Sequence, residues 1–190
     1  MKRFAVPALS ALLALSFSLP AVGAELAGVA MPDKMETGGK TLSLVGLGVR
    51  SKTIFAVKVY VAGLYMETPA KDAAVVLSSD QPKALAMEFV YSEVSGQQLQ
   101  DAWKEGFAAN TPKAEADLKA RMDRFVGLFT TPVKKGEKVL LSYLPGIGTI
   151  VTIAGKEAPV IPGADFATAL FAIWFGDKPA DAGLKAAVLK

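Results

Sequence analysis

The chain has 190 residues, with 21 basic against 18 acidic side chains and neither cysteine nor histidine. Without these two residue types there are no disulfides, no thiol or imidazole catalysis and none of the usual zinc ligand sets, and we expect no metal and no cofactor. The charged residues are scattered singly along the chain, which argues against nucleic acid as a partner, because phosphate binding needs a clustered positive patch.

The first 24 residues have the pattern of a cleavable secretory signal. Residues 2–3 are cationic, residues 4–19 are largely apolar, and residues 22–24 form a small-residue cleavage site. A membrane-spanning helix needs about 20 apolar residues, and this run is shorter. We therefore predict a signal peptide at residues 1–24, a periplasmic location, and no membrane span after cleavage.

The remaining part, residues 25–190, has the size of a single domain. Removing the signal takes away two cations, which leaves 21 − 2 = 19 basic against 18 acidic residues and a net charge of +1. An exported domain without disulfides must be stabilised by packing alone.

Five extended segments are predicted in chain order. They are residues 41–49, 54–66, 84–91, 139–143 and 149–153, the last two joined by a turn rich in proline and glycine. In the second segment Val57, Val59 and Val61 share one parity, whereas Lys58 and Tyr60 share the other. This strand is therefore expected to have one apolar wall and one mixed wall.

Helical spacing of apolar residues predicts three helices at residues 97–109, 118–129 and 166–174. Ser95 is the expected N-cap of the first, and Gly176 is expected to end the third. Strands and helices alternate in groups with hairpin-like links. This order predicts an α+β fold, a mainly antiparallel β-sheet covered on one face by a layer of helices.

Several blocks of the chain resemble the chalcone isomerase fold. They are Gly46-Leu47-Gly48-Val49-Arg50, Lys58-Val59-Tyr60-Val61-Ala62-Gly63-Leu64-Tyr65, Ser95-Gly96-Gln97-Gln98, the hairpin at 145–153 and the helix at 166–176. Chain length and export make the chain similar to the exported bacterial branch, the chalcone isomerase-like family. The resemblance implies an open-faced β-sandwich with a ligand cleft between sheet and helices.

The resemblance also implies where the enzymes' polar site residues would fall. Arg50 matches the arginine that holds the substrate's phenolate, whereas the threonine falls at Tyr60, the tyrosine at Leu99 and the asparagine at Gly106. A later hydroxyl position falls near residues 167–168. Only one of these four positions, Arg50, keeps the enzymes' residue. We therefore predict negligible conversion of chalcone to flavanone, because positioning and charge stabilisation by these side chains supply most of the rate of that reaction.

Arg50 and Tyr60 are the two candidate ligand-binding residues. Arg50 is expected at a turn after a glycine-rich strand, either exposed, or paired with a structural carboxylate, or facing the cleft. A buried, unpaired guanidinium is costly, so in the cleft it would require an anion such as a fatty acid. Tyr60 is expected either as half-buried packing or as a second anchor beside Arg50. Tyr91 and Tyr143 are weaker candidates for the same role.

Other motifs are interpreted as structural. Trp103 and Trp174 fit apolar helix faces and are expected in the core. The stretch at 46–48 lacks the third glycine and the parallel βαβ unit of a dinucleotide loop. Nothing in the sequence brings Glu88 and Glu93 together as an acid/base pair.

Three functions remain open. The first is a periplasmic protein that binds a fatty acid or similar small apolar carboxylate without the plant activity. The second is an isomerase or intramolecular lyase on another substrate, with Arg50 and Tyr60 as its polar pair. The third is an interaction protein whose cleft is filled by its own side chains.

Overall fold

A computed structural model describes residues 23–52 and 57–190. Residues 1–22 of the predicted signal peptide, and residues 54–56 of the second predicted strand, lie outside the described residues.

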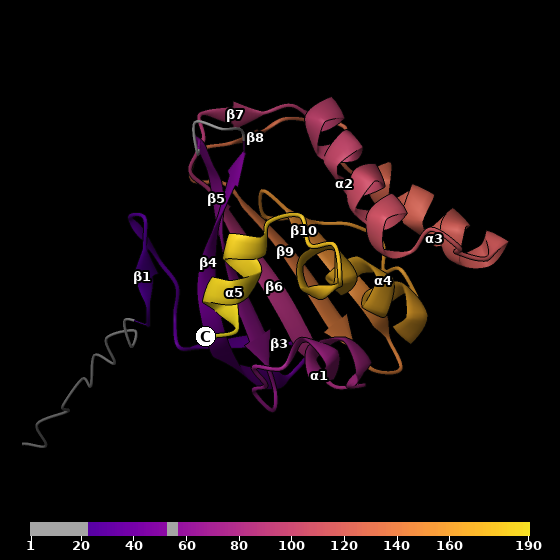
Figure 1. The fold of residues 1–190 in the computed structure, drawn as a ribbon, viewed down its shortest axis with the longest axis horizontal. Coiled ribbons are helices and arrows are strands. Elements are labelled where there is room, and N and C mark those ends of the chain that lie inside the picture. Colours follow the sequence, from indigo (N-terminus) through magenta and orange to yellow (C-terminus); the bar gives the residue numbers. More distant parts are fainter. Residues whose placement is uncertain (1–22, 53–56) are drawn as a thin grey trace, which may run out of the picture.

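A seven-stranded antiparallel sheet forms the centre of the molecule (Figure 1). Its strand order is β11-β10-β9-β6-β5-β4-β3. The strands are β3 (Lys34–Thr37), β4 (Lys40–Lys52), β5 (Val57–Met66), β6 (Lys83–Phe89), β9 (Lys138–Leu144), β10 (Gly148–Ile153) and β11 (Lys156–Glu157). Two short antiparallel pairs lie outside it: the hairpin of β1 (Glu25–Leu26) and β2 (Val29–Ala30), and the pair of β7 (Glu93–Val94) and β8 (Val133–Lys134), which are distant in the chain. All five predicted strands correspond to strands of the sheet.

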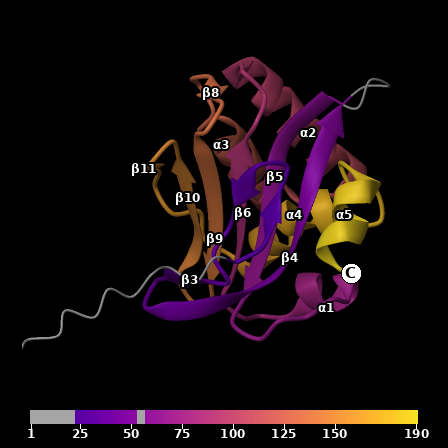
Figure 2. The same cartoon turned by 90° about the vertical axis from the view of Figure 1, so that its left-hand side faces the viewer.

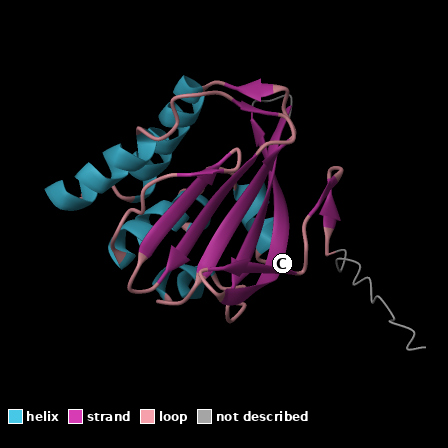
Figure 3. Ribbon diagram, turned by 180° about the vertical axis from the view of Figure 1, so that it is seen from behind, coloured by secondary structure: helices cyan, strands magenta, loops and turns pink. Residues whose placement is uncertain are grey.

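The helices lie on one face of the sheet, as Figure 2 shows from the side and Figure 3 from behind. They are α1 (Ala73–Ser78), α2 (Gly96–Asn110), α3 (Ala116–Val126), α4 (Ala164–Phe175) and α5 (Ala182–Val188). The predicted α+β fold, a mainly antiparallel sheet covered on one face by helices, is confirmed. Within the described ranges, no helix is long and apolar enough to cross a membrane.

The buried position of helix α4 explains why its sequence is apolar on all sides. Nine of its 12 residues are buried, because the helix packs against α1, α2 and the sheet at once. It ends at Gly176, as predicted. Sequence periodicity missed α1 and α5, which have only six and seven residues and are too short to show a repeating apolar stripe.

A smaller core lies on the sheet face away from the helices. It is formed by Val29, Met31, Leu42, Leu47, Val61, Tyr65 and Ala84. The N-terminal segment crosses this face, where the hydroxyl of Tyr65 donates a hydrogen bond to the carbonyl of Pro32 at 2.9 Å. Burial, with a smaller contribution from the charge of Asp33, raises the pKa of Tyr65 to about 12.

Two glycines in β4 allow α5 to lie directly on the sheet. A Cβ at Gly46 would be 2.3 Å from the carbonyl oxygen of Val188, and a Cβ at Gly48 would be 2.7 Å from that of Leu184. Both contacts are with backbone, which cannot move aside as a side chain can. The Gly-Leu-Gly stretch is therefore a helix-docking surface.

The β4–β5 pair contains a bulge next to the candidate site residues. Arg50 pairs with Tyr60, whereas the next residue, Ser51, pairs with Lys58. Val59 is therefore an extra residue in β5, and such an insertion interrupts the alternation of side chains along a strand.

The bulge overturns the predicted division of β5 into an apolar and a mixed wall. Val57, Val59 and Tyr60 all line one pocket on the helix side. Val61 instead belongs to the core on the opposite face. Alternation holds on each side of the bulge but changes phase at Val59, which is why strict parity assigned Tyr60 and Val57 to different walls.

Candidate functional site

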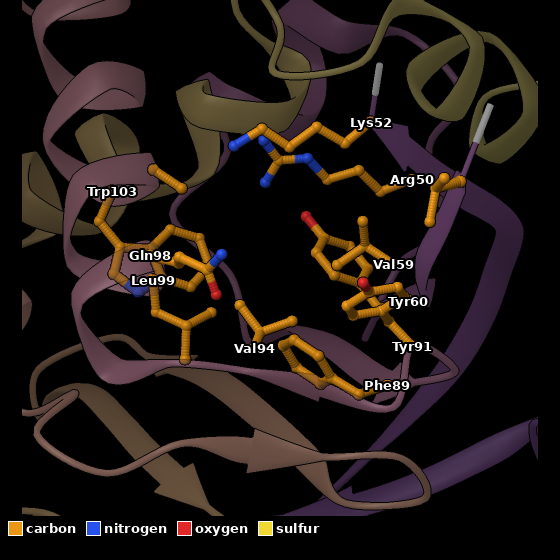
Figure 4. A pocket seen from close by; sticks show the side chains of 12 residues that line it. Arg50, Lys52, Val59, Tyr60, Phe89, Tyr91, Val94, Gln98, Leu99 and Trp103 are labelled. Carbon is orange, nitrogen blue, oxygen red and sulfur yellow. The ribbon is translucent and has the colours of Figure 1, made fainter. Parts of the chain in front are cut away.

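The pocket that contains both candidate residues opens where the ends of β4 and β5 meet α2 (Figure 4). Its volume is about 320 Å³. The lining residues are Arg50, Lys52, Val57, Val59, Tyr60, Phe89, Tyr91, Val94, Gln98, Leu99, Ala102 and Trp103. The sheet thus supplies Arg50, Lys52 and Tyr60, and α2 supplies Gln98 together with much of the apolar wall.

Helix α2 is held in place at its first turn by a capping box. The side chain of Ser95 accepts a hydrogen bond from the backbone N–H of Gln98 at 3.2 Å, and the Gln98 side chain accepts one from the backbone N–H of Ser95 at 2.9 Å. The predicted N-cap is confirmed. Two otherwise unpaired donors are satisfied, which stabilises the turn that carries Gln98 and Leu99.

Arg50 lies inside β4, not at a turn, because the strand continues to Lys52. Its side chain extends into the pocket (Figure 4). The guanidinium carbon is 5.8 Å from the centre of the Tyr60 ring, within the range of a cation–π contact. Arg50 forms no ion pair in the part of the chain that the structure describes, and residues 53–56 contain no acidic residue. The half-buried cation therefore faces the pocket without a protein anion.

Tyr60 is 1% exposed, so the expected half-buried packing with the hydroxyl in water is wrong. Its hydroxyl oxygen accepts a hydrogen bond from Nε1 of Trp174 at 2.8 Å. With that lone pair engaged, the hydroxyl proton of Tyr60 remains available as a donor. Trp174 is a core residue, as predicted, and it also orients the hydroxyl of Tyr60.

Two further residues line the pocket. Lys52 is not among the candidates predicted from the sequence, and Tyr91 is only a weaker candidate there. Lys52 lines the same pocket as Arg50 (Figure 4). A signal for Lys52 was present in the sequence, because residues two apart on a strand share a face. Tyr91 is held at the mouth by its backbone N–H, which donates to the carbonyl of the bulged Val59 at 3.2 Å.

The residues matched to the enzymes' other polar positions add no polar group to the pocket. Leu99 is buried in the wall, and Gly106 packs against Ile173 of α4. The hydroxyl of Thr168 donates to the carbonyl of Ala164 at 3.0 Å and lies outside the pocket. Trp103 belongs both to the core and to the pocket wall.

Tyr143 belongs to a separate polar cluster near the opposite end of the sheet. Its hydroxyl donates to a carboxylate oxygen of Asp80, and burial together with this carboxylate raises its pKa to about 12. Beside it, the Lys83 ammonium donates to the carbonyls of Val76 and Ser79 at 2.7 and 3.1 Å. Burial lowers the pKa of Lys83 to about 8. The hydrogen bonds from Lys83 of β6 hold α1 against the sheet.

The remaining acidic candidates are also away from the pocket. Glu88 forms an ion pair with Lys138 at 3.1 Å, and neither Glu88 nor Glu93 lines the pocket. Across residues 23–52 and 57–190, no group of three or more acidic, cysteine or histidine residues is placed to hold a metal ion.

Comparison with known proteins identifies the fold and the family. A family model described as chalcone isomerase-like matches residues 23–190. The crystal structure of a fatty-acid binding protein from Arabidopsis thaliana superposes with a TM-score of 0.70 and 16% sequence identity, covering 85% of this chain and 92% of that one. At this identity the similarity shows a shared fold. No curated protein sequence matches the chain.

Proposed function

The chain belongs to the chalcone isomerase-like family, and we propose that it is an exported protein that binds a fatty acid or a similar small apolar carboxylate. The ligand's carboxylate would contact Arg50 and Tyr60, and its hydrocarbon chain would lie against the wall formed by α2 and β5. The plant reaction, chalcone to flavanone, is not part of this proposal.

The observation that carries the proposal is a cation and a hydroxyl donor side by side in an apolar pocket. Arg50 and Tyr60 are directly paired across β4 and β5. No carboxylate lines the pocket. The positive charges of Arg50 and Lys52 therefore have no protein anion among the lining residues to neutralise them. A ligand carboxylate fits this arrangement, because it can accept hydrogen bonds from the guanidinium and from the Tyr60 hydroxyl together.

The size of the pocket favours a medium chain. The volume of about 320 Å³ lies at the lower end of the range of small-molecule sites, about 300–1,000 Å³. It therefore favours a shorter carboxylate, such as octanoate or decanoate, over a long-chain acid. The tail of a longer acid would have to leave through the mouth.

Two further observations bear on the alternatives. The pocket is open, which disfavours a protein whose cleft is filled by its own side chains. Leu99 and Gly106 supply no hydroxyl or amide side chain to it, which disfavours the isomerase or lyase alternative. The fold shared with a fatty-acid binding protein supports the ligand class.

The test is a calorimetric titration with octanoate, decanoate and decanol. We expect the wild type to prefer decanoate to decanol. Arg50→Ala should weaken binding of both acids by about ten- to a hundredfold, because a hydrogen bond to a charged group contributes about 1.5–3 kcal/mol. It should leave decanol unchanged. Arg50→Lys should restore part of the loss, since it keeps the charge but not the forked donor geometry.

Arg124→Ala is the matched control, because Arg124 is an exposed arginine on α3, away from the pocket. It should bind every ligand as the wild type does. Equal affinity of the wild type for decanoate and decanol would exclude a carboxylate site. Export is tested separately: N-terminal sequencing of the periplasmic fraction should begin at Glu25, and a chain retaining Met1 would contradict it.

A further inference from the structure

We propose that the rim of the pocket docks onto the surface of a lipid bilayer that contains anionic lipid. The rim consists of Lys52, Val57 and Tyr91, which line the pocket, and of Lys58, the next residue of β5, which lines a neighbouring groove. The bilayer would be a second partner of the protein, beyond the ligand in the pocket, and its binding does not depend on which ligand the pocket takes.

The first observation is the exposure of apolar side chains at the rim. Val57 is 39% exposed and Tyr91 is 45% exposed, and both line the mouth of the same pocket. Among the described residues, only Val75 and Ile147 are other large hydrophobic side chains with such exposure. A valine and a tyrosine at one opening match the membrane interface, where a tyrosine ring can enter the apolar layer while its hydroxyl stays hydrated.

The second observation is the charge around these apolar side chains. Lys52 pairs directly with Val57 across the hairpin, and Lys58 follows Val57 in the chain. Both lysines are exposed. In the groove next to Lys58, the acidic Glu88 is accompanied by Lys135 and by its own ion-pair partner. Two other carboxylates lie near the rim, Glu93 of β7 and Asp181, which accepts a hydrogen bond from the backbone N–H of Ser51. Arg50, Lys52, Lys58 and Lys135 outnumber them, so the local charge is positive, which favours a surface of anionic headgroups.

The third observation is that a flat surface, such as a bilayer, can contact all the rim residues at once. The rim residues lie where β4 ends, β5 begins and the chain leaves β6 toward β7, all at one end of the molecule (Figure 1). Tyr91 is tied to β5 through the carbonyl of Val59. The other exposed hydrophobic residues, Val75 of α1 and Ile147 of the β9–β10 turn, lie at the opposite end. Docking by the rim would place the pocket mouth against lipid.

The experiment is cosedimentation of the natively purified, delipidated protein with vesicles. One set contains phosphatidylcholine alone, and the other contains about one third phosphatidylglycerol. We expect binding to the anionic vesicles, weakened by raising the salt from about 0.1 M to about 0.5 M. Lys52→Gln with Lys58→Gln should reduce partitioning about thirtyfold. Val57→Ser with Tyr91→Ser should reduce it about tenfold.

The chain offers a matched control for each pair. Lys119→Gln with Lys156→Gln removes the same charge from exposed sites on α3 and β11, and Val75→Ser with Ile147→Ser removes the remaining exposed hydrophobic side chains. Both controls should bind vesicles nearly as the wild type does. If a control pair weakens binding as much as its rim pair, the interaction is non-specific and the proposal is wrong.

A second result would also overturn it. If the lysine pair matters while the rim pair of Val57 and Tyr91 has no effect, the surface binds anions without entering a bilayer. Residues 53–56 are left unchanged in every variant. Decanoate titration of Lys58→Gln keeps the two proposals apart, because Lys58 does not line the pocket and this variant should bind anionic vesicles about fivefold more weakly while it binds decanoate as the wild type does.

Discussion

The hydrogen bond from Trp174 to Tyr60 links the core to the candidate site, and Tyr60→Phe tests both of its consequences. The substitution leaves the Trp174 N–H, on a side chain 1% exposed, without its acceptor. An unsatisfied buried donor costs about 1–3 kcal/mol, so the free energy of unfolding should fall by that amount. Decanoate should also bind about ten- to a hundredfold more weakly, because one of its donors is gone. Decanol should lose less.

A double-mutant cycle separates this hydrogen bond from changes in packing. Urea unfolding is measured for Tyr60→Phe, Trp174→Phe and the double variant. Tyr60→Phe and Trp174→Phe each break the bond, so their combined effect should be smaller than the sum by about 1 kcal/mol. Additive effects, within about 0.3 kcal/mol, would show that the bond contributes nothing to stability. Unchanged decanoate affinity in Tyr60→Phe would remove Tyr60 from the site.

Two predictions concern stability away from the pocket. Gly46→Ala should lower the free energy of unfolding in urea by about 1–3 kcal/mol, because its Cβ would meet the Val188 carbonyl at 2.3 Å. In the control Gly127→Ala, the Cβ meets nothing closer than 3.5 Å, so the free energy of unfolding should stay unchanged or rise by up to about 1 kcal/mol. Equal effects of the two substitutions would refute the docking role of Gly46. Burial lowers the pKa of Lys83 from 10.5 to about 8. Between pH 8 and pH 10 the unfolded chain therefore binds more protons at this residue than the folded protein does. The free energy of unfolding should rise over this pH range, by at most about 3 kcal/mol. Lys83→Met should remove this rise, and the same slope in both proteins would contradict it.

The sequence by itself determined the elements that depend on neighbouring residues. The helix of α2 with Ser95 as its cap, the apolar α4 ending at Gly176, and the five central strands follow from spacing along the chain, because capping and apolar periodicity are local properties. The antiparallel α+β class follows from the order of these elements. Local blocks around Gly46–Arg50 were also sufficient to indicate the family. Arg50 and Tyr60 were identified in this way, and both line the pocket.

Only the tertiary structure decided how these residues face one another. The bulge at Val59 depends on the register between β4 and β5, so strict alternation assigned the side chains of β5 to the wrong walls. The partner of the Tyr60 hydroxyl, Trp174, is 114 residues away in the chain. Register and long-range contacts arise when separate elements pack together, and a pattern read within one segment contains no information about the residue that packs against it from another.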